Sequence, residues 1–188
     1  MKNLLILTFC FCLTLSINSQ SIYKGLKYGM TQAEAKKEFK KNKKDYTTVD
    51  LGNNLLYRIY RQNFVFINNK LVAVPLTPKG FAFGMQYDDA KNYLTATRSF
   101  FEKLGYEAFI DNKWWDAPLN FANSNSKWGL ILNKKDKSTI VQMYPVKYNV
   151  SSSTSFIVHL KVWHYDTWMN SYNNSKKQQK KITEKSGF

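Results

Sequence analysis

One nine-residue pattern occurs twice in this chain, and it constrains the architecture more than any other feature. The first copy, YGMTQAEAK, begins at Tyr28, and the second, FGMQYDDAK, begins 55 residues later at Phe83. Each copy reads aromatic, Gly, Met, three variable residues, acid, Ala, Lys. A glycine before a helix permits a tight turn, and repeated units share the residues that they use for packing. The repetition therefore predicts two similar units, residues 20–79 and residues 80–169.

The first copy is predicted to start a helix, which strands then follow. Thr31 and Glu34 have the spacing of a capping box, in which each side chain accepts a hydrogen bond from the other residue's amide. The stretch LLYRIY, residues 55–60, alternates two sets of side chains, as a strand does. The stretch FVFINNKLVAV, residues 64–74, reads as a hairpin around two asparagines that tolerate positive φ.

The second copy leads into a longer helix. Its apolar stripe consists of Ala90, Leu94, Thr97, Phe101 and Leu104. Gly105 then ends the helix, YEAFI reads as a strand, KWGLILN and STIVQMYPV read as a hairpin, and SFIVHLKVWHY reads as the longest strand. The fold class predicted is α+β, with two similar helix-plus-antiparallel-sheet units and the helices on one face of the sheet. The Ser-, Asn- and Lys-rich residues 170–188 are predicted to be a basic, flexible tail.

Residues 1–19 have the layout of a secretory signal peptide. Lys2 precedes a twelve-residue apolar run, and small residues follow it. A retained membrane anchor is the rival interpretation, but the run is shorter than the ~20 residues that span a bilayer. Cys10 and Cys12 both lie inside this run, so the mature chain would hold no disulfide and no thiol nucleophile. We expect an exported protein that is periplasmic or secreted, with association to an outer membrane as a further option.

The charge of the chain bears on its partners. It carries 28 Lys and Arg against 13 Asp and Glu, a formal net charge of +15. Such a chain attracts polyanions at long range, although a positive charge also serves simply to keep a protein soluble. For an exported protein the anions include lipid headgroups, acidic glycans and acidic proteins. No specific recognition of nucleic acid is expected.

The sequence contains no strong catalytic pattern. Nucleophile-elbow, phosphate-loop and zinc-protease motifs are absent from it. The two histidines, His159 and His164, are five residues apart on one predicted strand, so their side chains should point to opposite faces and not share a metal. We therefore expect no enzyme activity, no cofactor and no metal.

Three segments resemble a known group of proteins. GMTQAEA, LLYRIY and FVFINNKLVAV are similar to the SmpA/OmlA-type (BamE-like) outer-membrane assembly domains and to the beta-lactamase-inhibitor-protein-like (BLIP-like) fold. The resemblance covers residues 24–76 best and residues 80–165 less well, because residues 111–126 are inserted and Gln86 replaces the capping threonine. The chain also has no well-placed lipobox, and its mature part cannot form the disulfides that the inhibitor-like proteins often carry. The resemblance implies a helical pair packed on an antiparallel sheet, sometimes in tandem, and a non-catalytic binding module of the envelope.

The longest predicted strand separates into two faces. Phe156, Val158, Leu160 and Val162 share the face that should meet the helices. The other face holds Ser155, Ile157, His159, Lys161, Trp163 and Tyr165. Arg58 and Tyr60 lie opposite the apolar set of their own strand. If the two sheets are continuous, these side chains combine into one aromatic and basic surface of the kind that forms binding hot spots; the alternative is an ordinary cross-strand ladder that shields the sheet.

A second candidate site is the pair Trp114-Trp115, in a long loop. One of these tryptophans could project to stack on a sugar or fill a partner's pocket, or both could fold back as anchors of the loop. The predicted binding residues are Arg58, Tyr60, Trp114, Trp115, Lys161, Trp163 and Tyr165. The partner expected first is an envelope or extracellular protein, and the alternative is an anionic glycan or lipid headgroup.

Overall fold

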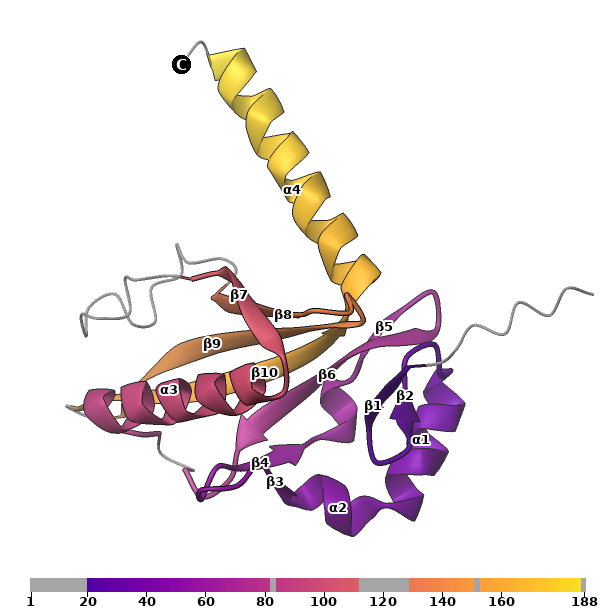
Figure 1. Cartoon of the computed structure of the whole chain (residues 1–188), viewed down its shortest axis with the longest axis vertical. Helices are drawn as coiled ribbons and strands as arrows, with labels where there is room; N and C mark the ends of the chain where they lie inside the picture. Colours follow the sequence, from indigo (N-terminus) through magenta and orange to yellow (C-terminus); the bar gives the residue numbers. More distant parts are fainter. Residues whose placement is uncertain (1–19, 82–83, 112–128, 151–152, 187–188) are drawn as a thin grey trace, which may run out of the picture.

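The fold is a large antiparallel sheet with helices packed against it, together with a separate two-stranded sheet of β1 and β2 (Figure 1). It is known from a computed structural model, which describes residues 20–81, 84–111, 129–150 and 153–186. The helices are α1 (Gln32–Lys41), α2 (Lys43–Thr47), the 3-10 turn η1 (Arg61–Asn63), α3 (Tyr87–Lys103) and α4 (Tyr165–Ser186). The strands are β1 (Ser21–Tyr23), β2 (Leu26–Lys27), β3 (Val49–Asp50), β4 (Leu56–Ile59), β5 (Val65–Ile67), β6 (Lys70–Pro78), β7 (Tyr106–Ile110), β8 (Leu130–Lys134), β9 (Thr139–Val150) and β10 (Ser153–His164). The α+β class predicted from the sequence is confirmed.

The sheet is continuous across the two predicted units. Its order is β3-β4-β6-β10-β9-β8-β7, with β5 pairing with β6 beside β4, and all its pairings are antiparallel. The last strand of each unit forms the seam, since β6 pairs with β10. In this seam Val74 lies opposite Val162 and Leu76 lies opposite Leu160. The two units therefore share one sheet.

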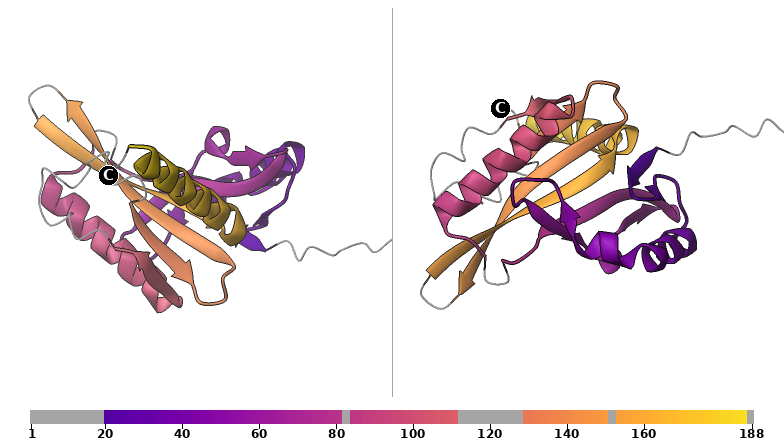
Figure 2. Two further views of the ribbon diagram at one scale, coloured as in Figure 1. Left: turned by 90° about the horizontal axis from the view of Figure 1, so that it is seen from above. Right: turned by 60° about the horizontal axis from the view of Figure 1, so that its bottom comes forward.

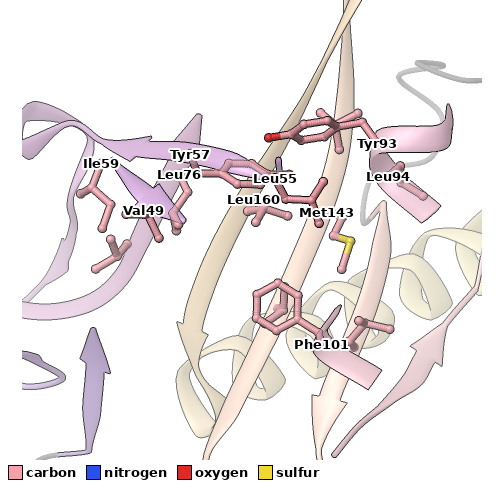
Figure 3. Close-up of a cluster of buried hydrophobic side chains, with 14 of the residues drawn as sticks. Val49, Leu55, Tyr57, Ile59, Leu76, Tyr93, Leu94, Phe101, Met143 and Leu160 are labelled. Atoms are coloured by element: carbon pink, nitrogen blue, oxygen red, sulfur yellow. The ribbon is translucent and has the colours of Figure 1, made fainter. Parts of the chain in front are cut away.

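The main hydrophobic core lies on the face of the sheet that α1, α2 and α3 cover, which we call the inner face. Figure 3 shows side chains from both units meeting there, with Tyr57 and Leu76 on one side and Tyr93 and Met143 on the other. The Tyr57 hydroxyl is buried and lies 3.0 Å from Thr97 Oγ1. This hydrogen bond joins β4 of the first unit to α3 of the second, and it gives each of two buried hydroxyls a partner. The two units therefore share one core.

The predicted inward face of β10 is also correct. Phe156, Val158 and Leu160 are buried in the main core, and Val162 packs against it while partly buried. The predicted asparagine hairpin is present as well, with Asn68 and Asn69 at φ of 48° and 58° between β5 and β6. The local sequence pattern was thus sufficient to predict the inward face of β10 and the position of the asparagine turn.

The repeated phrase has the same local structure in both places. Gly29 and Gly84 have φ of 84° and 82°, and the helix caps that follow, Thr31 and Gln86, are both extended. Each phrase also joins a strand through a pair of backbone hydrogen bonds of 2.7–2.9 Å, the first with Leu71 of β6 and the second with Phe156 of β10. The phrase therefore ties the start of a helix to the last strand of each unit.

The likeness of the two complete units, 20–79 and 80–169, stays a prediction. The first unit begins with β1 and β2 and then has two helices, α1 and α2, before the strands of the large sheet. The second unit has α3 alone before its strands. Leu104, predicted to continue the apolar stripe of α3, is instead 55% exposed, because α3 ends at Lys103.

The C-terminal segment differs most from expectation. Residues 170–188 were predicted as a flexible tail, but residues 170–186 belong to α4, which projects from the body of the molecule in Figure 1. The first turns of α4 pack on the side of the sheet opposite the main core, where buried Trp168 meets Ile131 and Ile140. The view from above in Figure 2 shows α3 and α4 on opposite sides of β9 and β10. The helices thus do not all lie on one face, and the flexibility of the segment remains a prediction.

We predict that the two glycines of the phrase differ in their tolerance of a side chain. A Cβ at Gly84 would approach Ser155 Cβ to 2.6 Å, whereas a Cβ at Gly29 would meet nothing within 4 Å. Gly29→Ala should cost about 1 kcal/mol for its left-handed backbone alone, and Gly84→Ala about 3 kcal/mol because it adds a clash at the strand. Urea unfolding measures both free energies. Equal losses would contradict the close packing of the second phrase on β10.

Candidate binding surface

The side of the sheet opposite the main core carries a connected row of polar and aromatic side chains. We call this row the outer face. It consists of Arg58, Tyr60, Thr77, Gln142, Tyr144, His159, Lys161 and Trp163. Its members come from β4, β6, β10 and β9, the four strands on either side of the seam, with Tyr60 directly after β4.

Lys161 is the centre of the row in the second unit. Its Nζ lies 5.2 Å from the ring centroid of Trp163 and 5.5 Å from that of Tyr144. Trp163 Nε1 in turn donates a 3.0 Å hydrogen bond to Gln142 Oε1 on β9. A cation between two ring faces is attracted to both, and the indole hydrogen bond fixes the orientation of one ring. The aromatic groups are therefore held in place before any partner arrives.

His159 and Thr77 connect this cluster to the first unit. The His159 ring stacks on Tyr144, with centroids 5.5 Å apart, and its Nδ1 lies 3.4 Å from Thr77 Oγ1 across the seam. Thr77 is paired in register with Arg58 of β4. Arg58 Nη1 donates a 2.9 Å hydrogen bond to the Tyr60 hydroxyl. Contacts or strand pairing thus connect each member of the row to the next.

Burial shapes the charge state of the row. Desolvation, and then the nearby Lys161 ammonium, lower the pKa of His159, so that its neutral form is favoured. Desolvation also lowers the pKa of Lys161, and burial raises the pKa of Tyr144. None of the eight residues of the row is an Asp or Glu, so the charged side chains of the row are all positive.

The structure therefore brings together four of the seven predicted binding residues: Arg58, Tyr60, Lys161 and Trp163. Tyr165 was predicted to extend the strand, but it begins α4, where it packs beside the small cluster around Trp168. Its amide donates a 3.3 Å hydrogen bond to the Ser138 carbonyl, which fixes the start of the helix at the end of the row. Trp114 and Trp115 lie outside the described residues, as does the predicted signal peptide.

The two histidines lie on opposite faces of β10, as their spacing predicts. His164 is on the inner side, 5.2 Å edge-on from Tyr28, and its Nδ1 lies 3.3 Å from Thr167 Oγ1. Within the described ranges, no three His, Cys, Asp or Glu side chains gather where a metal ion could be held. Nor does any helix in that part of the chain have the length and apolarity needed to cross a bilayer.

The structure adds a pocket that the sequence interpretation did not identify. It has a volume of about 580 Å³ and opens between α1, α2, β4 and η1. Its lining residues are Phe39, Lys40, Lys43, Thr47, Arg58, Ile59, Tyr60, Arg61, Gln62 and Lys79, and we call it the basic pocket. The i, i+4, i+7 spacing of Lys36, Lys40 and Lys43 was the signal available for a basic stripe on one side of the helix.

Comparison with protein families, with curated proteins and with solved structures finds no match for this chain. The resemblance to the BamE-like and BLIP-like groups therefore stays a prediction.

We predict that His159 makes the stability of the fold depend on pH. Its pKa in the folded chain is lower than the ordinary value of 6.5, so the unfolded chain binds a proton first as the pH falls. The free energy of unfolding should therefore decrease as the pH drops below 6.5 toward the folded pKa. Chemical unfolding at a series of pH values, for the wild type and for His159→Gln, measures this. The same pH slope in both proteins would contradict the burial of a neutral imidazole against Tyr144.

Proposed function

We propose that this chain is a non-catalytic binding module that docks a protein partner with an acidic surface on the outer face of its sheet. The observation that carries the proposal is the continuous row from Arg58 to Trp163, which crosses four strands and contains no acidic residue. The location in a cell envelope or outside the cell comes from the predicted signal peptide alone.

The composition of the row favours a protein partner. Trp, Tyr and Arg are the residues most enriched among interface hot spots, and the row contains all three. Its rings are partly exposed, and stacking, cation–ring contacts and a hydrogen bond already order them. Pre-ordered side chains lose less conformational entropy when a partner binds.

The size of the row sets its role within an interface. Four strands at a spacing of about 4.8 Å span about 14 Å, and the stretch from His159 to Trp163 has about the same length. The patch of roughly 200 Å² is much smaller than the ~800 Å² that each partner buries in a standard interface. The row would thus form the centre of a larger contact.

A polyanion or glycan binder is the second candidate function. The net charge of +15 and the cations of the basic pocket favour it. The two candidates differ in salt dependence, because counterion release makes polyanion binding fall steeply with salt.

Affinity capture from the native cell envelope tests the main proposal. The bait is the wild type, Trp163→Ala, or the control Leu104→Ala, which removes an exposed apolar side chain beyond the end of α3. We expect a 1:1 protein partner that stays bound at about 1 M salt, where the Debye length is about 3 Å. Its affinity, measured with the purified partner, should fall roughly 30-fold for Trp163→Ala and stay unchanged for Leu104→Ala.

Two outcomes would count against the proposal. Equal affinity of the wild type and Trp163→Ala, with both variants folded, would remove the outer face from the interface. Ligands that all dissociate at high salt, with Lys→Gln changes more harmful than Trp163→Ala, would replace the protein partner by a polyanion.

A further inference from the structure

The basic pocket exists because the edge strand of the sheet is short. β3 pairs with β4 only at Leu56 and Tyr57, so no further strand of the described chain covers this edge beyond Tyr57. There α1 and α2 form one wall, and β4 with η1 forms the other. Phe39 stacks on buried Tyr46 at 5.2 Å and meets Phe64 edge-on at 6.0 Å, so the apolar lining is fixed by the core behind it.

The charge of this pocket is of one sign. Five cationic side chains line it: Lys40, Lys43, Arg58, Arg61 and Lys79. No carboxylate is among the lining residues, and none of the five takes part in an ion pair within the described part of the chain. Five like charges around a hollow of this size lie within one or two Debye lengths of each other, so they repel.

Two of the cations are held in position. Arg58 donates to the Tyr60 hydroxyl while its Nε is buried with no acceptor among the described residues. Lys79 Nζ donates to Thr48 Oγ1. The remaining three are exposed at the rim, where they are free to close on a ligand.

The basic lining continues beyond the pocket. Lys36, one turn before Lys40, lines a neighbouring hollow of about 360 Å³ together with Gln32, Phe64 and Phe66, and Arg61 lines both hollows. Lysines at i and i+4 on one helix face destabilise the helix by mutual repulsion. An anion between α1 and η1 would relieve this repulsion.

We infer that the basic pocket binds a small ligand that bears a multiply charged oxyanion, such as a phosphate or sulfate group, on a ring-sized body. The guanidinium groups of Arg58 and Arg61 match the geometry of such oxyanions, and several lysines suit two or more charges better than a single carboxylate. The volume is in the range of small-molecule sites, and Phe39, Ile59 and Tyr60 give the body of the ligand an apolar surface. This site does not depend on the docking of a protein to the outer face.

Calorimetry with defined anions tests the site. The wild type is titrated with inorganic pyrophosphate, sulfate and acetate at constant ionic strength. The pocket variant is Lys40→Gln/Lys43→Gln, and the matched control is Lys37→Gln/Lys41→Gln, which removes the same charge from the same helical region outside both hollows. Arg61→Gln is a second pocket variant, in case the double variant does not fold.

We expect one molecule of pyrophosphate to bind the wild type more tightly than sulfate, and acetate to bind weakest. The pocket variants should lose roughly tenfold or more in affinity, in line with a lost charge-assisted hydrogen bond, and the control should bind as the wild type does. Pyrophosphate should also raise the Tm of the wild type more than that of Lys40→Gln/Lys43→Gln.

The source of the oxyanion is assigned by a second arm with lipid vesicles. The wild type, the pocket variant and the control are each tested for stronger binding to phosphatidylglycerol vesicles than to phosphatidylcholine vesicles. If only the pocket variant loses this preference, the oxyanion belongs to a lipid headgroup. Equal vesicle binding by the pocket variant and the control would exclude the headgroup and indicate a soluble ligand. No binding of pyrophosphate or sulfate to the wild type, or equal loss in the pocket and control variants, would overturn the site.

Discussion

The pairing of β6 with β10 is the interaction on which the rest of the structure depends. It joins the last strands of the two predicted units, so that one sheet replaces two. On the inner face it places Leu76 beside Leu160 and Val74 beside Val162, and the main core extends across the seam. On the outer face it places Thr77 next to His159, and this contact makes one row out of two separate groups of side chains.

Pro75 lies in the interior of β6, and the sheet accommodates it because neither β4 nor β5 pairs with β6 at that position. Pro75 lies opposite Lys161 in the interior of β6, where a missing N–H would normally disrupt a sheet. On its other side, β4 pairs from Leu76 onward and β5 pairs only as far as Ala73, because η1 separates the two strands. β6 therefore runs on past Pro75 to Pro78. The same interruption places Arg61 of η1 at the basic pocket.

The two proposed surfaces meet at one pair of residues. Arg58 and Tyr60 belong to the outer face and also line the basic pocket. Lys161 and Trp163 belong only to the outer face, and Lys40, Lys43 and Arg61 only to the pocket. Variants of the unshared residues therefore separate protein docking from anion binding. An anion bound in the basic pocket beside Arg58 would also change the charge at the Arg58 end of the outer face.

Features set by neighbouring residues could be predicted from the sequence. The capping box is present, since Thr31 Oγ1 accepts a 3.3 Å hydrogen bond from the Glu34 amide and Glu34 Oε2 accepts a 2.7 Å bond from the Thr31 amide. The faces of β4 and β10 follow from side-chain alternation. Features set by distant pairing could not be predicted: the alternation on β10 does not show that β6 lies beside it. The site was therefore only partly foreseen, with four residues brought together across the seam and the pocket missed.

The C-terminal helix shows a second limit. Beyond Tyr172 the sequence of α4 is lysine-rich and polar except for Ile182, and this composition is typical of a tail. The packing of Trp168 against Ile131 and Ile140 instead fixes the start of the helix on the sheet. The signal for this packing was present in the sequence but was not used. Tyr165, Trp168, Met169 and Tyr172 have the i, i+3, i+4, i+7 spacing of one apolar helix face, and all four lie at this cluster.

Nuclear Overhauser effects between methyl groups test the seam most directly. Contacts are expected between Leu76 and Leu160 and between Val74 and Val162, each opposite in register across β6 and β10. The pairs Met143–Leu160 and Val141–Val162 of the β9–β10 ladder serve as internal references. Observation of all four contacts would confirm one continuous sheet and one outer face. Reference contacts without those across the seam would show two separate sheets, and the row from Arg58 to Trp163 would not exist.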